Sequence, residues 1–328
     1  MILYTSTGAQ ITTGKPKGSG GEAAIFAVHG QDNVLAKIYG KPNTNHERKL
    51  KAMVANPPDD PSKNIGHASI SWPIDLLYDG RTRQFAGYLM PFVKNAVMLI
   101  QVINPMMRKK VLPGFDWKYL HRSARNLAAA VGALHARGYV IGDLNESNVL
   151  VNPMALVTVI DCDSMQVKIG SQVLPCPVGK PDYTPPELQG VPFARVQRLP
   201  EHDAFALGIL VYQLLLNGNH PYRSQWLGRG DPLPIEQRIK NGWFPYSRQA
   251  CPKEIALPPR APLLGWLYPK VSVLARRCFI EGYKNPKQRP SPREWEAALA
   301  EAEKAIVPCF KGHQYSRHLP QCPRCQRP

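Results

Sequence analysis

Apolar residues recur along the chain at two periods, and each period predicts a different kind of secondary structure. Alternating apolar positions predict β-strands at residues 24–28, 34–39 and 85–93, all within the first third of the chain. From residue 116 to residue 137 apolar side chains instead repeat every three or four positions, which predicts a long helix with one buried face. The predicted strands therefore precede the first long helix.

Further apolar runs predict the elements of the C-terminal part. Residues 205–216 form the longest such run and predict a core helix, and residues 271–279 and 294–305 predict two later helices. Between these regions, the short runs 149–151 and 157–159 predict a hairpin of two buried strands. Helices thus dominate the second half of the chain, with one small hairpin among them.

Polar residues flank the predicted hairpin. Asp143 lies in the loop before it, Asn148 follows five residues later, and Asp161 comes directly after the second strand. The hairpin brings Asn148 and Asp161 to one edge, where oxygen ligands suit Mg²⁺ held jointly with phosphates. Asp143 is then placed to accept a proton from a hydroxyl nucleophile. Taken singly, each of these residues also fits a turn or a helix cap.

Composition predicts a soluble cytoplasmic protein without membrane contact. The longest apolar run is too short to span a bilayer, and the N-terminus lacks a secretory signal pattern. Seven scattered cysteines, an odd number, argue against a disulfide framework and favour a reducing compartment. Prolines gather at residues 56–61 and 257–269, which we expect to be loops.

The chain is strongly basic, with a formal net charge of +17. Lysines and arginines cluster at residues 108–110, 276–277, 284–289 and 311–327. Such charge attracts phosphate-bearing polymers or acidic proteins, so nucleic-acid binding is one interpretation. An ordinary basic surface is the other, because too few aromatic residues accompany the charges to indicate base stacking.

The last twenty residues contain a second group of candidate ligands. Cys309, His313, Cys322 and Cys325 have the spacing C-x3-H-x8-C-x2-C, which predicts a structural Zn²⁺ site in the tail. His318 could replace His313 as the fourth ligand. The alternative is a disordered tail whose cysteines have no common role.

The spacing of Asp143, Asn148 and Asp161 resembles the catalytic loop and magnesium loop of protein kinases. Upstream, Gly-Ser-Gly-Gly-Glu-Ala at residues 18–23 resembles the kinase glycine-rich loop, with Ala23 in place of the third glycine. Val-Leu-Ala-Lys at residues 34–37 is similar to the kinase V-A-I-K strand. The glycine segment alone would also fit a flexible linker.

The resemblance implies a role for each candidate residue. ATP and Mg²⁺ (or Mn²⁺) would be the cofactors, Asp143, Lys37 and Glu47 the catalytic set, and Lys37 and Glu47 an ion pair. Leu89 would take the gatekeeper position at the back of the nucleotide site, and backbone groups near Met90 and Phe92 would bind adenine. The implied nucleotide and Mg²⁺ contacts are Gly18, Ser19, Gly20, Gly21, Ala23, Ile25, Ala36, Lys37, Met90, Phe92, Asn148 and Asp161.

Later landmarks extend the resemblance over most of the chain. Residues 183–188 resemble the A-P-E motif, Asp203 matches the aspartate that braces the catalytic loop, and Arg289 matches the arginine that pairs with the A-P-E glutamate. The implied fold is a bilobal α+β kinase fold. Its predicted parts are an N-lobe at 1–91, a hinge and C-lobe at 92–305, and a zinc-knuckle tail at 306–328.

Three departures from the kinase pattern bear on mechanism. Gly142 replaces the arginine of H-R-D, so phosphorylation of the activation segment should not switch this protein on. Asn145 replaces a lysine found in many serine/threonine kinases, which removes a positive charge. D-F-G becomes Asp-Cys-Asp at residues 161–163, and Asp163 is either a third acidic contact or a turn residue.

These features together predict a serine/threonine protein kinase of a bacterial-type signalling or stress system. Its partners would be a protein substrate and a cognate phosphatase or adaptor protein. Two alternatives stay open. One is a pseudokinase scaffold that binds nucleotide without phosphoryl transfer, and the other is a nucleic-acid-associated regulator that uses the basic surface and the zinc tail.

Overall fold

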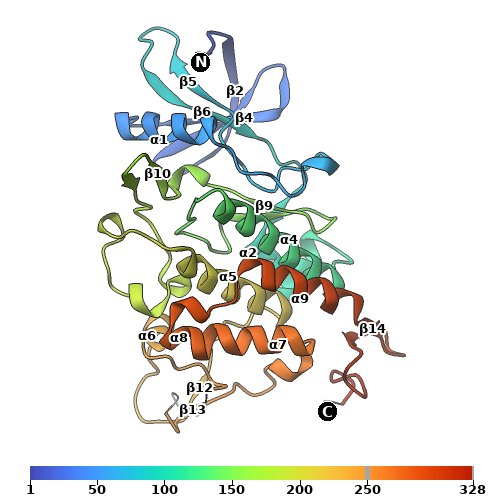
Figure 1. Cartoon of the computed structure of the whole chain (residues 1–328). Helices are drawn as coiled ribbons and strands as arrows, with labels where there is room; N and C mark the ends of the chain where they lie inside the picture. The colour runs from blue at the N-terminus through green and yellow to red at the C-terminus, as the bar shows by residue number, and fades with distance from the viewer. Residues whose placement is uncertain (248–251, 327–328) are drawn as a thin grey trace.

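In the computed structural model, which describes residues 1–247 and 252–326, the N-terminal part of the chain curls one antiparallel sheet into a closed barrel (Figure 1). The strands follow the order β1-β2-β3-β4-β6-β5 around it. They are β1 (Ile2–Thr5), β2 (Gln10–Ser19), β3 (Ala23–Val28), β4 (Gln31–Tyr39), β5 (Asp75–Asp79) and β6 (Phe85–Pro91). The three strands predicted from alternation are confirmed as β3, β4 and β6.

Alternation gives the barrel strands two faces with different neighbours. One face fills a small core made of Leu3, Ile11, Val28, Ala36, Leu77 and Leu89. The other face joins a larger core that is shared with the rest of the molecule. Helix α1 (Thr44–Ala55) packs on that second face through Leu50 and Met53, and it begins where the Asn43 side chain accepts a hydrogen bond from the His46 N–H.

The second lobe is mainly helical. Its longer helices are α3 (Pro105–Val111), α4 (Trp117–Ala136), α5 (Pro200–Leu215), α7 (Pro269–Arg276) and α9 (Pro292–Lys304), and its shorter ones are α2 (Leu99–Ile103), α6 (Ile235–Lys240) and α8 (Gly282–Lys284). Between the lobes lies a small sheet of β7 (Val97–Met98), β8 (Val149–Val151) and β9 (Val157–Val159). Two-stranded sheets are formed by β10 (Val167–Ile169) with β11 (Gln172–Leu174) and by β12 (Gln225–Trp226) with β13 (Ile255–Ala256).

Helix α5 is the centre of this lobe because nearly all of its side chains are buried. Helix α4 packs against it and buries one face, as the period of its apolar residues predicts. The Asp116 side chain caps α4 by accepting a hydrogen bond from the Tyr119 N–H. The predicted hairpin is confirmed as β8 and β9, and its buried strands carry the loops that hold the candidate site.

The tail after α9 folds back onto the helical lobe. Strands β14 (Ile306–Pro308) and β15 (Gln314–Ser316) pair with each other, and the Gln314 side chain accepts a hydrogen bond from the Lys118 N–H and donates one to Asp116. The strand-rich first lobe and the helical second lobe confirm the predicted bilobal α+β class. In the described ranges, the helices are too short or too polar to cross a bilayer.

Candidate active site and cysteine cluster

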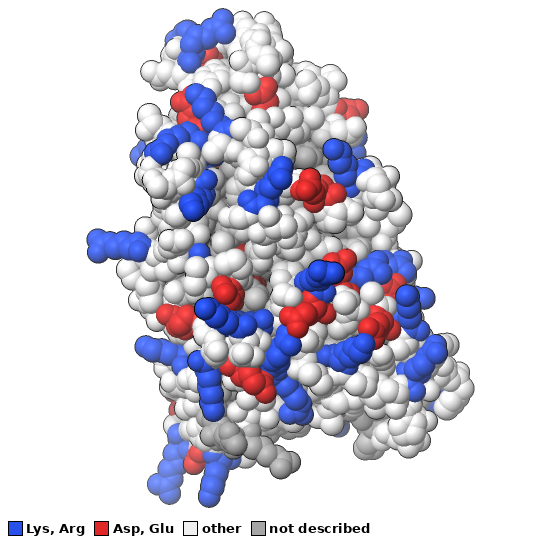
Figure 2. All heavy atoms as spheres, in the orientation of Figure 1, with Lys and Arg blue, Asp and Glu red and all other residues white. Residues whose placement is uncertain are grey.

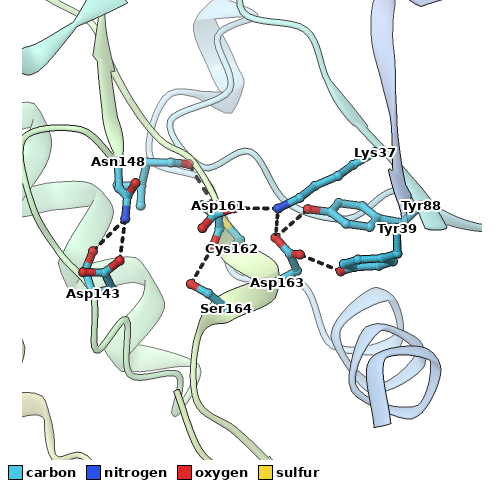
Figure 3. Close-up of polar contacts among 10 residues, drawn as sticks. Lys37, Tyr39, Tyr88, Asp143, Asn148, Asp161, Cys162, Asp163 and Ser164 are labelled. Carbon is cyan, nitrogen blue, oxygen red and sulfur yellow. Dashed lines mark hydrogen bonds and ion pairs between the residues drawn. The ribbon is translucent and has the colours of Figure 1, made fainter. Parts of the chain in front are cut away.

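Strand β4 carries Lys37 into the space between the two lobes, where it meets two carboxylates (Figure 3). The Lys37 Nζ lies 2.5 Å from Asp161 Oδ1 and 2.7 Å from Asp163 Oδ1. Both aspartates follow β9, with Asp161 directly before the 3₁₀ turn Cys162–Ser164 and Asp163 within it. Burial would lower the pKa of Lys37, but Asp163 and Asp161 raise it above its ordinary value, so the amine stays a cation.

The two aspartates have different surroundings. The Asp161 side chain is 41% exposed, and its backbone lies in the left-handed region with φ of +61°. Such a conformation is costly outside glycine and is often found at functional sites. The Asp163 side chain is only 9% exposed. Asp161 therefore faces the open space between the lobes, and Asp163 is enclosed.

Two tyrosines complete the surroundings of Asp163. The Tyr39 hydroxyl donates to Asp163 Oδ2 at 2.5 Å, and the Tyr88 hydroxyl donates to Asp163 Oδ1 at 2.8 Å. Burial and the Asp163 charge raise the pKa of both tyrosines, so both hydroxyls remain protonated donors. Burial alone would raise the pKa of Asp163, but Lys37 and the two hydroxyls hold it below its ordinary value. Asp163 is thus a fully bonded anion.

Asp143 lies on the loop before β8, next to two amides. The Asn148 Nδ2 donates to the Asp143 backbone oxygen at 2.9 Å and to its carboxylate at 3.1 Å, and the Asn145 Nδ2 donates to the same carboxylate at 2.9 Å. Since the amide nitrogen of Asn148 makes these bonds, its oxygen is the atom left for a cation. Burial raises the pKa of Asp143 despite the two amides, which suits a group that accepts a proton.

Residues beneath the loop fix its position. Asp203 at the start of α5 accepts hydrogen bonds from the Ile141 N–H at 2.7 Å and the Gly142 N–H at 2.8 Å, and it lies 2.9 Å from His135. Arg289 makes two hydrogen bonds to the Glu187 carboxylate, at 2.6 and 2.8 Å. The bracing role predicted for Asp203 and the predicted Arg289–Glu187 pair are both confirmed.

The predicted Lys37–Glu47 ion pair is not formed. Glu47 on α1 instead lies 2.7 Å from Lys51, one helical turn later, and accepts a hydrogen bond from Tyr78 at 3.1 Å. These partners lower the pKa of Glu47, and they hold it away from Lys37. The face of α1 that is buried carries Lys49, Leu50 and Met53. The structure therefore does not bring Glu47 into the site.

The structure also corrects the nucleotide contacts predicted for Ala36 and Phe92 and the gatekeeper position predicted for Leu89. Ala36 and Leu89 pair with each other across β4 and β6 and lie in the small barrel core, away from Lys37. The Phe92 N–H donates to the Asn33 oxygen at 2.8 Å, so it is not free to bind adenine. Leu35 and Met90, two residues from Lys37 and Tyr88 along their strands, share the face of the site.

The glycine segment forms the turn between β2 and β3. The Gly20 N–H donates to the Ala23 oxygen at 2.9 Å, Ser19 pairs with Ala24, and Ile25 lies opposite Lys37. A Cβ added at Gly18 or Gly21 would meet no protein atom within 4 Å. Neither glycine is therefore needed for packing or for the turn, and the space beside them is open to a ligand that requires close backbone approach.

Sequence reasoning did not find Arg198, which is 2% exposed. Its Nη1 donates to the Gly142 oxygen and its Nη2 to the Val178 oxygen at 2.7 Å, so it joins the loop that carries Asp143 to the segment that follows β11. Gly142 has φ of +75°, and a Cβ there would come within 2.7 Å of the Cys176 Cβ. An arginine at position 142 would not fit, and Arg198 supplies a guanidinium to this place from elsewhere in the chain.

The tail brings together the predicted zinc ligands. The ligand atoms of Cys309, His313, Cys322 and Cys325 all lie within 4.8 Å of one another. The Cys309 and Cys325 sulfurs are 3.7 Å apart, and the His313 Nδ1 lies 3.4 Å from the Cys325 sulfur. In a tetrahedral site with Zn–S bonds of about 2.3 Å, two sulfurs lie about 3.8 Å apart. This Cys₃His cluster therefore has the spacing that a zinc ion requires.

His318, the alternative fourth ligand, lies outside the cluster. Its Nδ1 lies 2.9 Å from the Ser316 hydroxyl, and its Nε2 lies 3.2 Å from the Gly265 oxygen. Both ring nitrogens therefore have partners, and the contact with Gly265 holds the tail to the helical lobe. The structure favours His313 over His318 as the fourth ligand.

Comparison with known proteins finds similarity to protein kinases along most of the chain. The family model for the protein kinase domain matches residues 63–295. Protein kinase YegI of Escherichia coli O157:H7 is 31% identical over 326 residues, and its counterpart in Escherichia coli strain K12 is 30% identical over the same length. A shorter match, 34% identical over 127 residues, is to the human serine/threonine-protein kinase SBK2 and covers 37% of this chain and 34% of that protein.

The alignments with the two bacterial kinases cover 98% of this chain but only 50% of each relative. The chain thus spans about half the length of these curated relatives. The kinase family model begins at residue 63, so the glycine turn and Lys37 lie outside its match and inside the longer alignments.

Proposed function

The chain belongs to the protein kinase family, and on that premise we propose that it transfers the γ-phosphoryl group of ATP to serine or threonine hydroxyls of protein substrates. The observation that carries this proposal is the convergence of Lys37 of β4, Asp143 and Asn148 of the loop before β8, and Asp161 after β9 on the space between the lobes. We further propose that the protein works in a bacterial-type signalling or stress system in the cytoplasm.

Each group has a chemical task in this proposal. Lys37 donates to the α- and β-phosphate oxygens of ATP, and the Asp161 carboxylate and the Asn148 amide oxygen hold Mg²⁺ or Mn²⁺. When bound, the metal ion neutralises charge that develops on the phosphate oxygens. Asp143 orients the acceptor hydroxyl and takes its proton, for which its raised pKa suits it.

The edge of β6 offers groups for adenine. Successive residues of a strand point their backbone groups in opposite directions. Because the Phe92 N–H points to Asn33, the Pro91 carbonyl and the Val93 N–H point away from β4, on the side of β6 where the pairing with β5 ends at Leu89. We propose that these two groups take the place of the predicted Met90 and Phe92 contacts.

A cavity beside the catalytic loop offers space for the polypeptide substrate. It has a volume of about 370 Å³ and is lined by residues of α2, α3, α5, α6 and the loops near Glu146 and Tyr183. Its walls include the apolar Ile100 and Met107 and the acidic Asp182. We propose that a substrate segment lies here while its hydroxyl reaches Asp143.

Incubation of the purified protein with labelled ATP, Mg²⁺ and a generic basic protein substrate tests the transfer. Label should appear on serine or threonine in acid hydrolysates, and Asp143→Asn and Asp161→Asn should each reduce transfer at least roughly a hundredfold. His318→Gln, a matched polar change far from the site, serves as a control and should transfer normally. Label on tyrosine, or undiminished transfer by either aspartate variant, would refute the assignment.

A nucleotide-binding pseudokinase is the second candidate, because the residue that donates to the Asp143 carboxylate from position 145 is an asparagine, whose amide carries no charge. On that hypothesis, Mg²⁺ and ATP would raise the melting temperature without any transfer to a substrate or to the protein itself. A melting shift accompanied by labelled product excludes the pseudokinase.

We also propose that the Cys₃His cluster holds a structural Zn²⁺ ion that folds the tail. Metal analysis of the purified protein should give one zinc per chain, and Cys322→Ser should lose it. Cys278→Ser, at a buried cysteine in the helical lobe, is the matched control and should retain the metal. Equal zinc content in all three proteins would contradict the proposal.

Nucleic-acid binding and a cognate phosphatase or adaptor partner remain predictions. On the face shown in Figure 2, basic side chains are spread over both lobes with acidic ones among them. That mixture does not single out a nucleic-acid surface. A steep fall of RNA or DNA affinity with rising salt would support one.

A further inference from the structure

We propose that Asp163 is the residue that positions Lys37 for the nucleotide phosphates, in the role that the sequence assigned to Glu47 of α1. This inference rests on the proposed function, because it concerns how the phosphate-binding lysine is held. It gives a task to the third residue of the Asp-Cys-Asp turn, which the transfer mechanism does not otherwise use.

The contacts of Asp163 use both of its carboxylate oxygens to hold Lys37 and two tyrosines. One carboxylate oxygen accepts from both Lys37, at 2.7 Å, and Tyr88, at 2.8 Å, while the other accepts from Tyr39, at 2.5 Å. The three donors come from β4 and β6 of the first lobe, so the carboxylate ties that lobe to the loop after β9. Charge-assisted bonds of this kind, with every oxygen satisfied, restrict a long lysine side chain to one position.

Exposure separates the roles of the two aspartates. Asp161 is 41% exposed and faces the space where a metal ion and phosphates would enter, whereas Asp163 is 9% exposed and surrounded by its donors. If Asp161 turned to a metal ion, Lys37 would lose one of its two carboxylates and keep the other. Asp163 would therefore hold the lysine both before and after nucleotide binding.

Helix α1 has no other acidic residue that could position Lys37. Glu47 is the only acidic residue between Thr44 and Ala55, and it is bonded to Lys51 and Tyr78. The side of α1 that faces inward carries the cation Lys49. Asp163 lies two residues from Asp161, in the same turn. This turn therefore positions both Lys37 and the proposed metal ligand Asp161, and the position of α1 does not affect either residue.

Nucleotide affinity gives the direct test, and it requires no turnover. A fluorescent ATP analogue with Mg²⁺ should bind Asp163→Asn at least roughly tenfold more weakly than the parent protein, because the lysine is no longer held. Glu47→Gln, the matched change at the competing anchor, should bind within about twofold of the parent. Asp163→Glu, which retains the charge, should recover part of the affinity. Equal losses in Glu47→Gln and Asp163→Asn, or no loss in either, would overturn the proposal.

A double-mutant cycle distinguishes positioning from a merely structural role. In a Lys37→Met background, Asp163→Asn should cause no further loss of nucleotide affinity, because Asp163 acts through Lys37. Additive losses would show that Asp163 acts independently and would contradict the proposal. The same cycle is measured on the free energy of unfolding of the nucleotide-free protein. There the Lys37 and Asp163 substitutions should show an interaction energy, and the Lys37 and Glu47 substitutions should show none.

The unfolding cycle also separates this proposal from the proposed function. If the parent protein bound nucleotide but transferred nothing, the kinase assignment would fail, while the Lys37–Asp163 coupling would still be measured. If Asp163→Asn did not fold, Asp163→Glu and Tyr88→Phe, each in the parent and Lys37→Met backgrounds, would complete the test. Absence of coupling in these pairs would refute the anchor.

Discussion

The two sides of the candidate site follow the kinase pattern to different degrees. On the side of the helical lobe, Asp203 and the Arg289–Glu187 pair make the contacts that the sequence motifs imply. On the side of the barrel, Lys37 does not bond to Glu47 and instead bonds to Asp161 and Asp163. The comparison shows that the lysine of the kinase-like strand is kept while its carboxylate partners differ from the one that the sequence pattern implies.

The difference has a physical origin. In the helical lobe, Asp203 accepts hydrogen bonds from backbone N–H groups of a fixed loop. A different acceptor would have to occupy the same buried position, because backbone N–H groups cannot reach out to other partners. In the barrel, Lys37 is a long side chain that can reach several partners. The aspartate at position 163 provides a carboxylate where the family has a glycine, and the lysine bonds to it.

The largest effect is expected in the helical lobe, from Asp203→Ala. The change leaves the Ile141 and Gly142 N–H groups and His135 without their common acceptor in a buried position. We expect the free energy of unfolding to fall by about 3–5 kcal/mol, measured by urea denaturation. Asp203→Asn, which retains one acceptor oxygen, should cost less. A loss below about 1 kcal/mol for Asp203→Ala would show that the loop is held by other contacts.

A gain in stability is expected on the barrel side, from Lys49→Met. Burial lowers the pKa of Lys49 to about 8 from its ordinary value of 10.5, so holding it as a cation costs up to about 3 kcal/mol at neutral pH. The unfolded chain binds this proton more tightly than the folded one, so the stability of the parent protein should rise from pH 8 to pH 10.5. Lys49→Met should be more stable at pH 7, and its unfolding should lack that rise.

Lys51→Met provides the control for the lysine prediction. Lys51 is on the same helix, but its side chain is 59% exposed and its hydrogen bond to Glu47 raises its pKa. Its replacement should not stabilise the protein and should not remove the rise in stability above pH 8. Identical behaviour of the two variants would mean that the burial of Lys49 is not the cause.

The smallest effect is expected from Tyr39→Phe, which removes one of the hydroxyls that bond to Asp163. Because Lys37 and Tyr88 still donate to this carboxylate, we expect unfolding to cost about 1 kcal/mol less than in the parent protein, with a few-fold loss of nucleotide affinity. Thermal denaturation and nucleotide titration measure both quantities. Tyr78→Phe, which removes a bond to Glu47, should affect stability only. A larger effect on affinity from Tyr78→Phe than from Tyr39→Phe would favour Glu47 over Asp163.

Spacing along the sequence predicted the helical side well. The distance from Asp143 to Asn148, the hairpin, and the helix from residue 117 to 136 are local features, so one segment contains the information that sets them. The C-x2-C pair with Cys309 and His313 likewise predicted a group of ligands that the fold brings together. Such features do not depend on a choice between faces or between distant partners.

The barrel side was predicted less accurately, for two physical reasons. Moving an assignment by one residue on a strand transfers a side chain to the opposite face, which is why Ala36 and Leu89 were wrongly placed. Asp163 bonds to Lys37, 126 positions earlier in the chain, and no local pattern indicates which of two carboxylates such a lysine will bond. Arg198 was missed for the same reason, since its contact with Gly142 spans 56 positions.

The guanidinium of Arg198 also bears on how this protein could be controlled. Two carbonyl oxygens, those of Gly142 and Val178, already accept from it, and the ring of Phe193 lies 4.0 Å from its centre. These contacts join the loop at Gly142 to the segment at Val178 as soon as the chain has folded. They do not require a phosphate added by another enzyme. We therefore expect the loop around Gly142 to keep its position whether or not the segment after β11 carries a phosphate.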